Sequence, residues 1–167
     1  MTWKVSHRKP SVLTKMKNWL KSTCEWLFDD GSGGMTISKG KIHDYYLGMT
    51  LDYTVPGEVK ISMIPYVEEI LQLFAEHDKS ESTAQKLAAE NLFKVNEETT
   101  PLTQEGAATI FQNFVAKCWL LTKQARPGIA TAIAFLTTRV KGPDEDDWKK
   151  LVGMIHYLRR STTLPLI

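Results

Sequence analysis

The chain has 167 residues, a formal net charge of +2, 43% hydrophobic residues and 24% charged residues, values that exclude a disordered or collagen-like polypeptide and allow a sizeable core. No apolar run approaches the ~20 residues that a membrane helix needs, so we expect no membrane partner. Cys24 and Cys118 stand far apart without metal-site spacing, which excludes a disulfide framework and a cysteine-based zinc site and indicates a reducing, intracellular compartment.

The first predicted element is an amphipathic helix over residues 11–27, which ends at the glycine-rich stretch 29–34. Its apolar residues recur at helical spacing: Leu13, Met16, Leu20, Cys24 and Leu27. The period then changes to two over residues 46–53, where apolar and polar side chains alternate as they do in a half-buried strand.

A β-hairpin is the second predicted element. Pro56 supplies the fixed φ and Gly57 the positive φ of a type II turn after the first strand. Residues 59–63 then alternate again, which predicts the returning strand.

A second helix is predicted from Pro65, because proline suits the first helical position. Its apolar stripe is Val67, Ile70, Leu71 and Phe74. The polar, acidic segment that follows is long for a loop inside one compact domain, which indicates a boundary between lobes. We therefore expect three parts: residues 1–77, an acidic connector at 78–102, and a helical region at 103–167.

Three helices are predicted in that last region. The first has a broad apolar face from Ala107 to Trp119, and the second opens at Pro127. The third begins at Asp144 and closes with basic residues, in agreement with the helix dipole at both ends. The expected fold class is α+β: a small antiparallel β-hairpin or sheet with an N-terminal helix, followed by a mainly helical lobe.

Charge is strongly segregated along the chain. Residues 1–27 carry a net +5, residues 68–105 a net −6, and residues 106–143 a net +5 with no acidic residue at all. A stretch without acids can lie against a phosphate backbone without local repulsion. The alternative interpretation is a pair of solvated helices that happen to be basic.

No self-contained active site is predicted. Asp29-Asp30 is interpreted as a helix-to-strand loop and Gly31–Gly34 lacks the lysine of a phosphate loop. The acids at 144–147 are interpreted as helix caps, because contiguous acids on a helix point in different directions. The four histidines form no Ser-His-Asp or Cys-His pattern, so we expect neither a catalytic residue nor a metal ligand.

An ordered set of short runs resembles a known family. The runs are Tyr46-Leu47-Gly48-Met49, Val59-Lys60-Ile61-Ser62 with Tyr66, Phe114-Val115-Ala116-Lys117, Ala125-Arg126-Pro127-Gly128-Ile129, Ala132-Ile133-Ala134-Phe135-Leu136 and His156-Tyr157-Leu158-Arg159-Arg160. No single tetrapeptide is specific, but the set covers nearly the whole chain. Together the runs resemble the reverse transcriptase of copia-type long-terminal-repeat retrotransposons.

The resemblance implies that the chain corresponds to the palm rim, primer grip, thumb and connection. In that family a Tyr-x-Asp-Asp strand comes shortly before a helix like 11–27, and a ribonuclease H domain follows the connection. We therefore expect the catalytic aspartates and their Mg²⁺ in an upstream polymerase region rather than in this chain. The expected partners are these two regions and an RNA–DNA or DNA template–primer duplex.

The resemblance also implies which residues touch nucleic acid. Tyr46, Leu47, Gly48 and Met49 correspond to a primer grip, where glycine lets the backbone approach the strand closely. The acid-free helices supply the expected phosphate contacts: Lys117, Lys123, Arg126, Arg139 and Lys141. The family has one tyrosine before Leu-Gly, whereas this chain has Tyr45-Tyr46, and an extra strand residue reverses the side-chain faces unless a β-bulge absorbs it.

Two other classes of function stay open at this point. The first is a nucleic-acid-binding module with no role in a polymerase. The second is a helical protein-interaction module whose charge only keeps it soluble.

Overall fold

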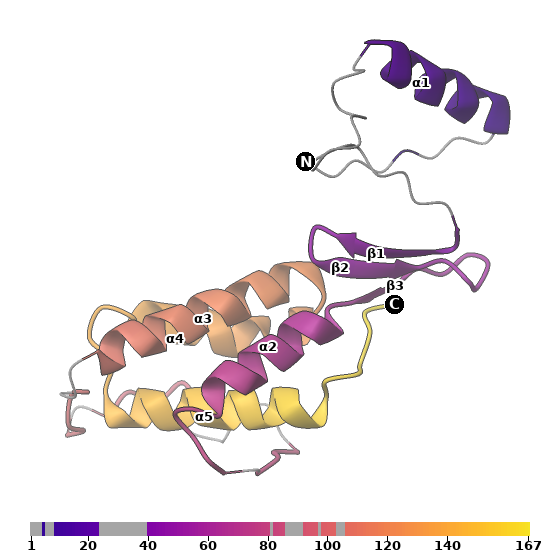
Figure 1. The fold of residues 1–167 in the computed structure, drawn as a ribbon. Coiled ribbons are helices and arrows are strands. Elements are labelled where there is room, and N and C mark those ends of the chain that lie inside the picture. The colour runs from indigo at the N-terminus through magenta and orange to yellow at the C-terminus, as the bar shows by residue number, and fades with distance from the viewer. Residues whose placement is uncertain are drawn as a thin grey trace.

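The computed structural model describes residues 5, 9–23, 40–80, 82–85, 92–96, 98–102 and 106–167. Figure 1 shows a small sheet beside a group of helices. The elements are α1 (Pro10–Thr23), β1 (Ile42–Tyr46), β2 (Met49–Asp52), β3 (Lys60–Ser62), α2 (Ile64–Phe74), α3 (Ala107–Gln124), η2 (Pro127–Ile129, a 3₁₀ turn), α4 (Ala130–Arg139) and α5 (Glu145–Arg160). The predicted α+β class is confirmed.

The helix α1 agrees with the predicted helix over the residues that are described. Trp19 on this helix is exposed. The predicted continuation to residue 27 and the stretch 29–34, with its aspartate pair and glycines, lie outside the described residues. None of the helices in the described ranges is long and apolar enough to cross a membrane.

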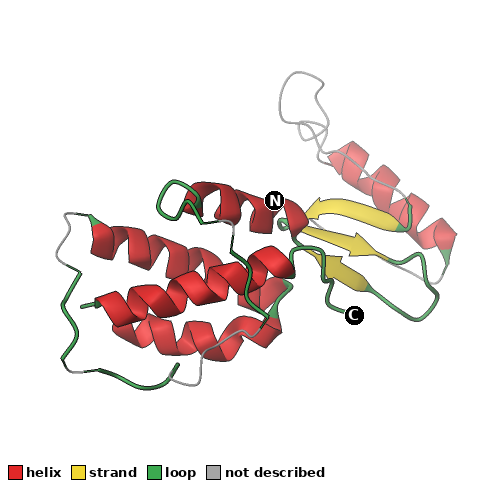
Figure 2. Cartoon of the chain, turned by 90° about the horizontal axis from the view of Figure 1, so that it is seen from below, coloured by secondary structure: helices red, strands yellow, loops and turns green. Residues whose placement is uncertain are grey.

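The three strands form one antiparallel sheet in the order β1-β2-β3 (Figure 2). The prediction of one continuous strand through residues 46–53 was wrong, because β1 and β2 are joined by a two-residue turn at Leu47 and Gly48. Their φ angles of 52° and 80° are both positive, as a type I′ hairpin turn requires. The apolar alternation runs through the turn without a break, so the pattern concealed it.

The second hairpin, between β2 and β3, was predicted correctly. The backbone N–H of Glu58 donates to the carbonyl of Val55 at 3.2 Å, and Gly57 has a φ of 85°. These are the closing hydrogen bond and the positive φ of the predicted type II turn, with Pro56 at its first central position.

A β-bulge absorbs the extra residue of β1, which is one of the two outcomes that the tyrosine doublet left open. His43 lies opposite Leu51 and Tyr46 lies opposite Met49, so the register shifts by one residue between these pairs. Two positions of β1, 44 and 45, therefore face Thr50 alone, which is the arrangement of a bulge.

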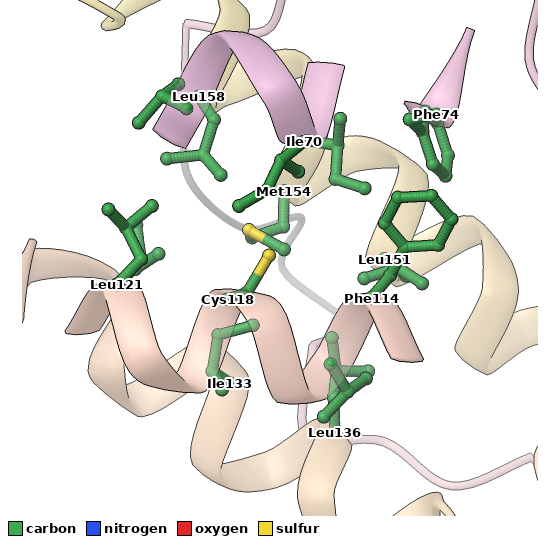
Figure 3. Close-up of a cluster of buried hydrophobic side chains, with 14 of the residues drawn as sticks. Ile70, Phe74, Phe114, Cys118, Leu121, Ile133, Leu136, Leu151, Met154 and Leu158 are labelled. Atoms are coloured by element: carbon green, nitrogen blue, oxygen red, sulfur yellow. The ribbon is translucent and has the colours of Figure 1, made fainter. Parts of the chain in front are cut away.

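The helices α2, α3, α4 and α5 enclose one hydrophobic core (Figure 3). Its fully buried side chains include Ile70, Phe74, Phe111, Cys118, Leu121, Ile133, Leu136, Leu151, Met154, Ile155 and Leu158. The helix α2 belongs to this core, although the sequence groups it with the hairpin. Cys118 lies at its centre, where burial raises the pKa of the thiol to about 12 and keeps it protonated at neutral pH.

The helix α5 begins with the predicted cap. The side chain of Asp144 accepts from the backbone N–H of Asp147, and the side chain of Asp147 accepts from the N–H of Asp144. This reciprocal pair is a capping box, which satisfies two donors that the first turn leaves without partners. The interpretation of these acids as helix caps is confirmed.

Several described parts of the acidic connector are hydrogen-bonded to α5. The N–H of Ala84 donates to the carbonyl of His156 at 3.3 Å, and Lys150 donates to the carbonyl of Lys94 at 2.6 Å. The carbonyl of Thr100 accepts from Glu145 at 3.1 Å. The connector is thus hydrogen-bonded to α5 near its end, in its middle and at its first residue.

The last residues return to the sheet, where Figure 1 places the C-terminus beside β3. Ile61 and Leu166 exchange two backbone hydrogen bonds, with N···O distances of 2.8 and 2.9 Å. The outer edge of β3 is therefore paired at this position by residues that follow α5.

Candidate nucleic-acid interface

The β1–β2 turn presents the predicted primer-grip residues at the tip of a hairpin. Leu47 is 56% exposed, whereas Met49 packs against the hydrophobic core. A Cβ on Gly48 would lie 3.6 Å from Cε of Met63, a buried core residue. In Figures 1 and 2 the turn lies at the end of the sheet nearest the helices. The tip is accessible to solvent, and the residues next to it pack against the hydrophobic core.

The backbone of this tip is strained at one residue. Leu47 is the one non-glycine residue with a positive φ in the part of the chain that the structure describes. The left-handed region costs a residue other than glycine, asparagine or aspartate roughly 1–2 kcal/mol. A leucine at this position is therefore not explained by turn stability.

Lys117 faces α2. Its ammonium lies 2.7 Å from Oε1 of Glu69 and 5.7 Å from the centre of the Tyr66 ring. The hydrogen bond to Glu69 raises the pKa of Lys117 above its ordinary value. The charge is balanced within the chain by an acid that lies far away in the sequence.

Arg126 holds the residues that follow α5. Its guanidinium donates to the carbonyl of Thr162 at 2.7 Å and also to the carbonyl of Ser161. Burial lowers the pKa of Arg126 below its ordinary value, although an arginine keeps its charge at neutral pH. This residue fastens the C-terminal segment to the end of α3.

Replacing Arg126 by Ala is expected to lower the free energy of unfolding by about 2 kcal/mol, because two charge-assisted hydrogen bonds are lost. The amide of Leu166, which bonds to Ile61, is expected to lose protection against hydrogen exchange. Arg126→Lys keeps the charge but not the two-acceptor geometry, so it should show most of the same loss. Unchanged protection in both variants would contradict the fastening role.

Arg139 belongs to the capped end of α5. Its Nε donates to Oδ2 of Asp147 at 2.9 Å, and its Nη2 lies 3.3 Å from Oδ2 of Asp144. The hydrogen bond to Asp147 raises the pKa of Arg139 above its ordinary value. Three of the five predicted phosphate contacts thus have partners within the chain.

Lys123 and Lys141 are the two that stay exposed. The ammonium of Lys123 lies 4.3 Å from the centre of the Trp119 ring on the same helix face. The side chain of Lys141 forms no ion pair or hydrogen bond within the described residues. The structure therefore divides the predicted set by surroundings: three cations bond to acids or carbonyls of the chain, and two face the solvent.

A polar cluster that the sequence did not predict joins the connector to α5. The Nε2 of His156 lies 2.8 Å from Oδ2 of Asp78 and 3.2 Å from Oγ of Ser80. Arg159 donates to the carbonyls of Ser80 and Ser82 at 2.7 and 2.9 Å. The Asp-x-Ser spacing is the local signal that was available, since aspartate commonly accepts from the N–H two residues later.

The geometry of this cluster is structural rather than catalytic. In a Ser-His-Asp triad the carboxylate and the hydroxyl bond to opposite nitrogens of the imidazole. Here both lie at Nε2, and Ser80 also bonds directly to Asp78 at 2.9 Å. The backbone N–H of Ser80, and then His156, hold the pKa of Asp78 below its ordinary value.

No group of three or more histidine, cysteine, aspartate or glutamate side chains in the described ranges is arranged to hold a metal ion. The acids at the start of α5 bond to backbone, Arg139 and Lys150 instead.

A comparison with protein-family models finds no match for the chain, and comparisons with curated proteins and with solved structures find none either.

Proposed function

We propose that this chain holds nucleic acid as a non-catalytic part of a copia-type reverse transcriptase, with the β1–β2 turn against a template–primer duplex. The observation that carries the proposal is Leu47, an apolar residue kept in a strained backbone at an exposed hairpin tip. Strain of this kind persists where surrounding structure enforces it and is concentrated at functional sites. A sugar–phosphate strand offers the apolar sugar faces that such a tip would contact.

The charge distribution supports the same proposal. Lys123 and Lys141 lie in the stretch 106–143, which contains no acid, and both are exposed. A protein that holds any sequence is expected to contact sugar and phosphate rather than base edges. Lys123 suits that task best, because no acid lies near it in the sequence, whereas Lys141 stands three residues before Asp144.

Catalysis is assigned elsewhere in the complete polymerase. The sequence contains no Tyr-x-Asp-Asp motif, which in the resembling family supplies carboxylates for Mg²⁺. Those ions would activate the primer hydroxyl and stabilise the leaving pyrophosphate. The residues of this chain would position the duplex, so the purified chain is expected to extend no primer.

The test is a fluorescence-anisotropy titration of the chain with a blunt RNA–DNA hybrid over a range of salt concentrations. Log affinity is expected to fall linearly with log salt concentration. The double variant Lys123→Gln/Lys141→Gln should reduce the slope by about 2, since each phosphate contact contributes about 0.9. The matched variant Lys79→Gln/Lys149→Gln removes two exposed lysines from acidic segments and should leave the slope unchanged.

Leu47→Asn tests the hairpin tip separately. Asparagine tolerates the left-handed backbone, so this variant should unfold at a higher denaturant concentration than the parent chain. Its affinity for the hybrid should nevertheless fall, with the salt slope unchanged. An affinity that rises together with stability, or an absence of salt-dependent binding by the parent chain, would refute the proposed function.

A further inference from the structure

The C-terminal half of α3 keeps an apolar patch on its solvent side, formed by Trp119 and Leu120. They are 38% and 44% exposed, although the opposite side of the same helix supplies fully buried residues such as Phe111 and Cys118. Large apolar side chains at neighbouring exposed positions are a feature of interaction surfaces. The patch is therefore a candidate binding surface.

Lys123 indicates which kind of ligand would suit this patch. Its ammonium lies over the Trp119 ring at 4.3 Å, which is the geometry of a cation–π contact. Lys117, on the same helix, is instead neutralised by Glu69 at 2.7 Å. The acid-free sequence from 106 to 143 supplies no carboxylate to neutralise Lys123 locally. An aromatic ring and a cation that pairs with no carboxylate of the described residues lie side by side at the surface.

An anionic, planar partner complements both groups at once. A nucleobase has the flat π-face that stacks on tryptophan, and the adjoining phosphate has the charge that attracts an ammonium. Single strands expose their base faces, whereas a blunt duplex keeps them stacked inside. The pair thus fits an unpaired nucleotide better than a duplex backbone.

We propose that Trp119 and Lys123 form a binding site for an unpaired nucleotide of a single-stranded segment. The ammonium of Lys123 moves from the ring to the phosphate, and the base takes its place on Trp119. The site rests on the proposed nucleic-acid function, in which Lys123 already contacts phosphate, and adds to it a contact between Trp119 and a base.

The experiment compares three probes by anisotropy: an oligo-dT strand, an abasic strand of the same length and charge, and the blunt RNA–DNA hybrid. Trp119→Ala should weaken oligo-dT binding about tenfold, within the range measured for base stacking, and leave the abasic strand unaffected. Lys123→Gln should weaken both strands and reduce the salt slope by about 0.7. Leu120→Ala, a truncation of the adjacent exposed side chain, should change no affinity by more than about twofold.

Trp119→Phe guards against an effect of misfolding. Phenylalanine still stacks, so oligo-dT affinity should fall less than in Trp119→Ala, while the quenching of tryptophan fluorescence by oligo-dT should disappear. Equal effects of Trp119→Ala on oligo-dT and the abasic strand would overturn the proposal and leave the proposed function standing if the hybrid still binds. If the parent chain does not bind the hybrid but binds oligo-dT more tightly than the abasic strand, the duplex function alone is rejected. If the variants change the affinity for none of the probes, the nucleotide site is overturned.

Discussion

Replacing Asp147 by Ala is expected to lower the free energy of unfolding by about 3 kcal/mol, measured by chemical denaturation followed by circular dichroism. The residue is 1% exposed. Its Oδ2 accepts from Nε of Arg139 at 2.9 Å and from the N–H of Asp144 at 3.3 Å. The substitution removes one half of the capping box and leaves a partly buried guanidinium with a single carboxylate partner.

Two matched variants separate these causes. Asp147→Asn keeps the size and an acceptor oxygen but not the charge. It should therefore lower the free energy of unfolding by about half as much as Asp147→Ala does. Glu145→Ala removes an exposed acid from the same turn that takes no part in the capping box, and should cost less than about 1 kcal/mol. If Asp147→Ala proves as mild as Glu145→Ala, the network does not stabilise the helix start.

Phe74→Ala is expected to cost about 3–5 kcal/mol of unfolding free energy, the range for truncating a buried aromatic side chain. The ring is fully buried and meets Phe114 edge-on at 5.1 Å and Trp148 in a stacked arrangement at 5.9 Å. It therefore joins α2 to both α3 and α5. The same titration also shows whether the helices unfold in one transition.

The adjacent Leu73 provides the control for this prediction. It lies on the same helix and is 37% exposed, so Leu73→Ala should cost less than about 1 kcal/mol. Similar losses in the two variants, or a Phe74→Ala chain with the parent's stability, would mean that α2 does not share the core of α3, α4 and α5.

The elements that could be predicted from sequence are those that local chemistry determines. The periodicity of α2, α3 and α5 follows from side-chain spacing, and the Pro56-Gly57 turn and the Asp144 cap follow from the φ preferences and hydrogen-bonding groups of single residues. The turn at Leu47 was missed because leucine has no preference for the left-handed backbone that it occupies.

The partners of the charged residues could not be predicted in the same way. Lys117 and Glu69 are separated by 48 residues, and His156 and Asp78 by 78. No local rule connects residues so far apart, because their meeting depends on how the helices pack. Composition showed that the stretch 106–143 is basic, but only the packing shows which of its cations balance acids or carbonyls and which are left at the surface.

The return of the chain to the sheet has a mechanical consequence. Ile61 is bonded to Leu166, and the residues just before Leu166 are gripped by Arg126 at the end of α3. We therefore expect these bonds to restrict rotation of the hairpins about the short link before α2. A displacement of the hairpin tip is passed on through β3 and Leu166 to the residues that follow α5. The sheet and the helices should therefore move together as one rigid body.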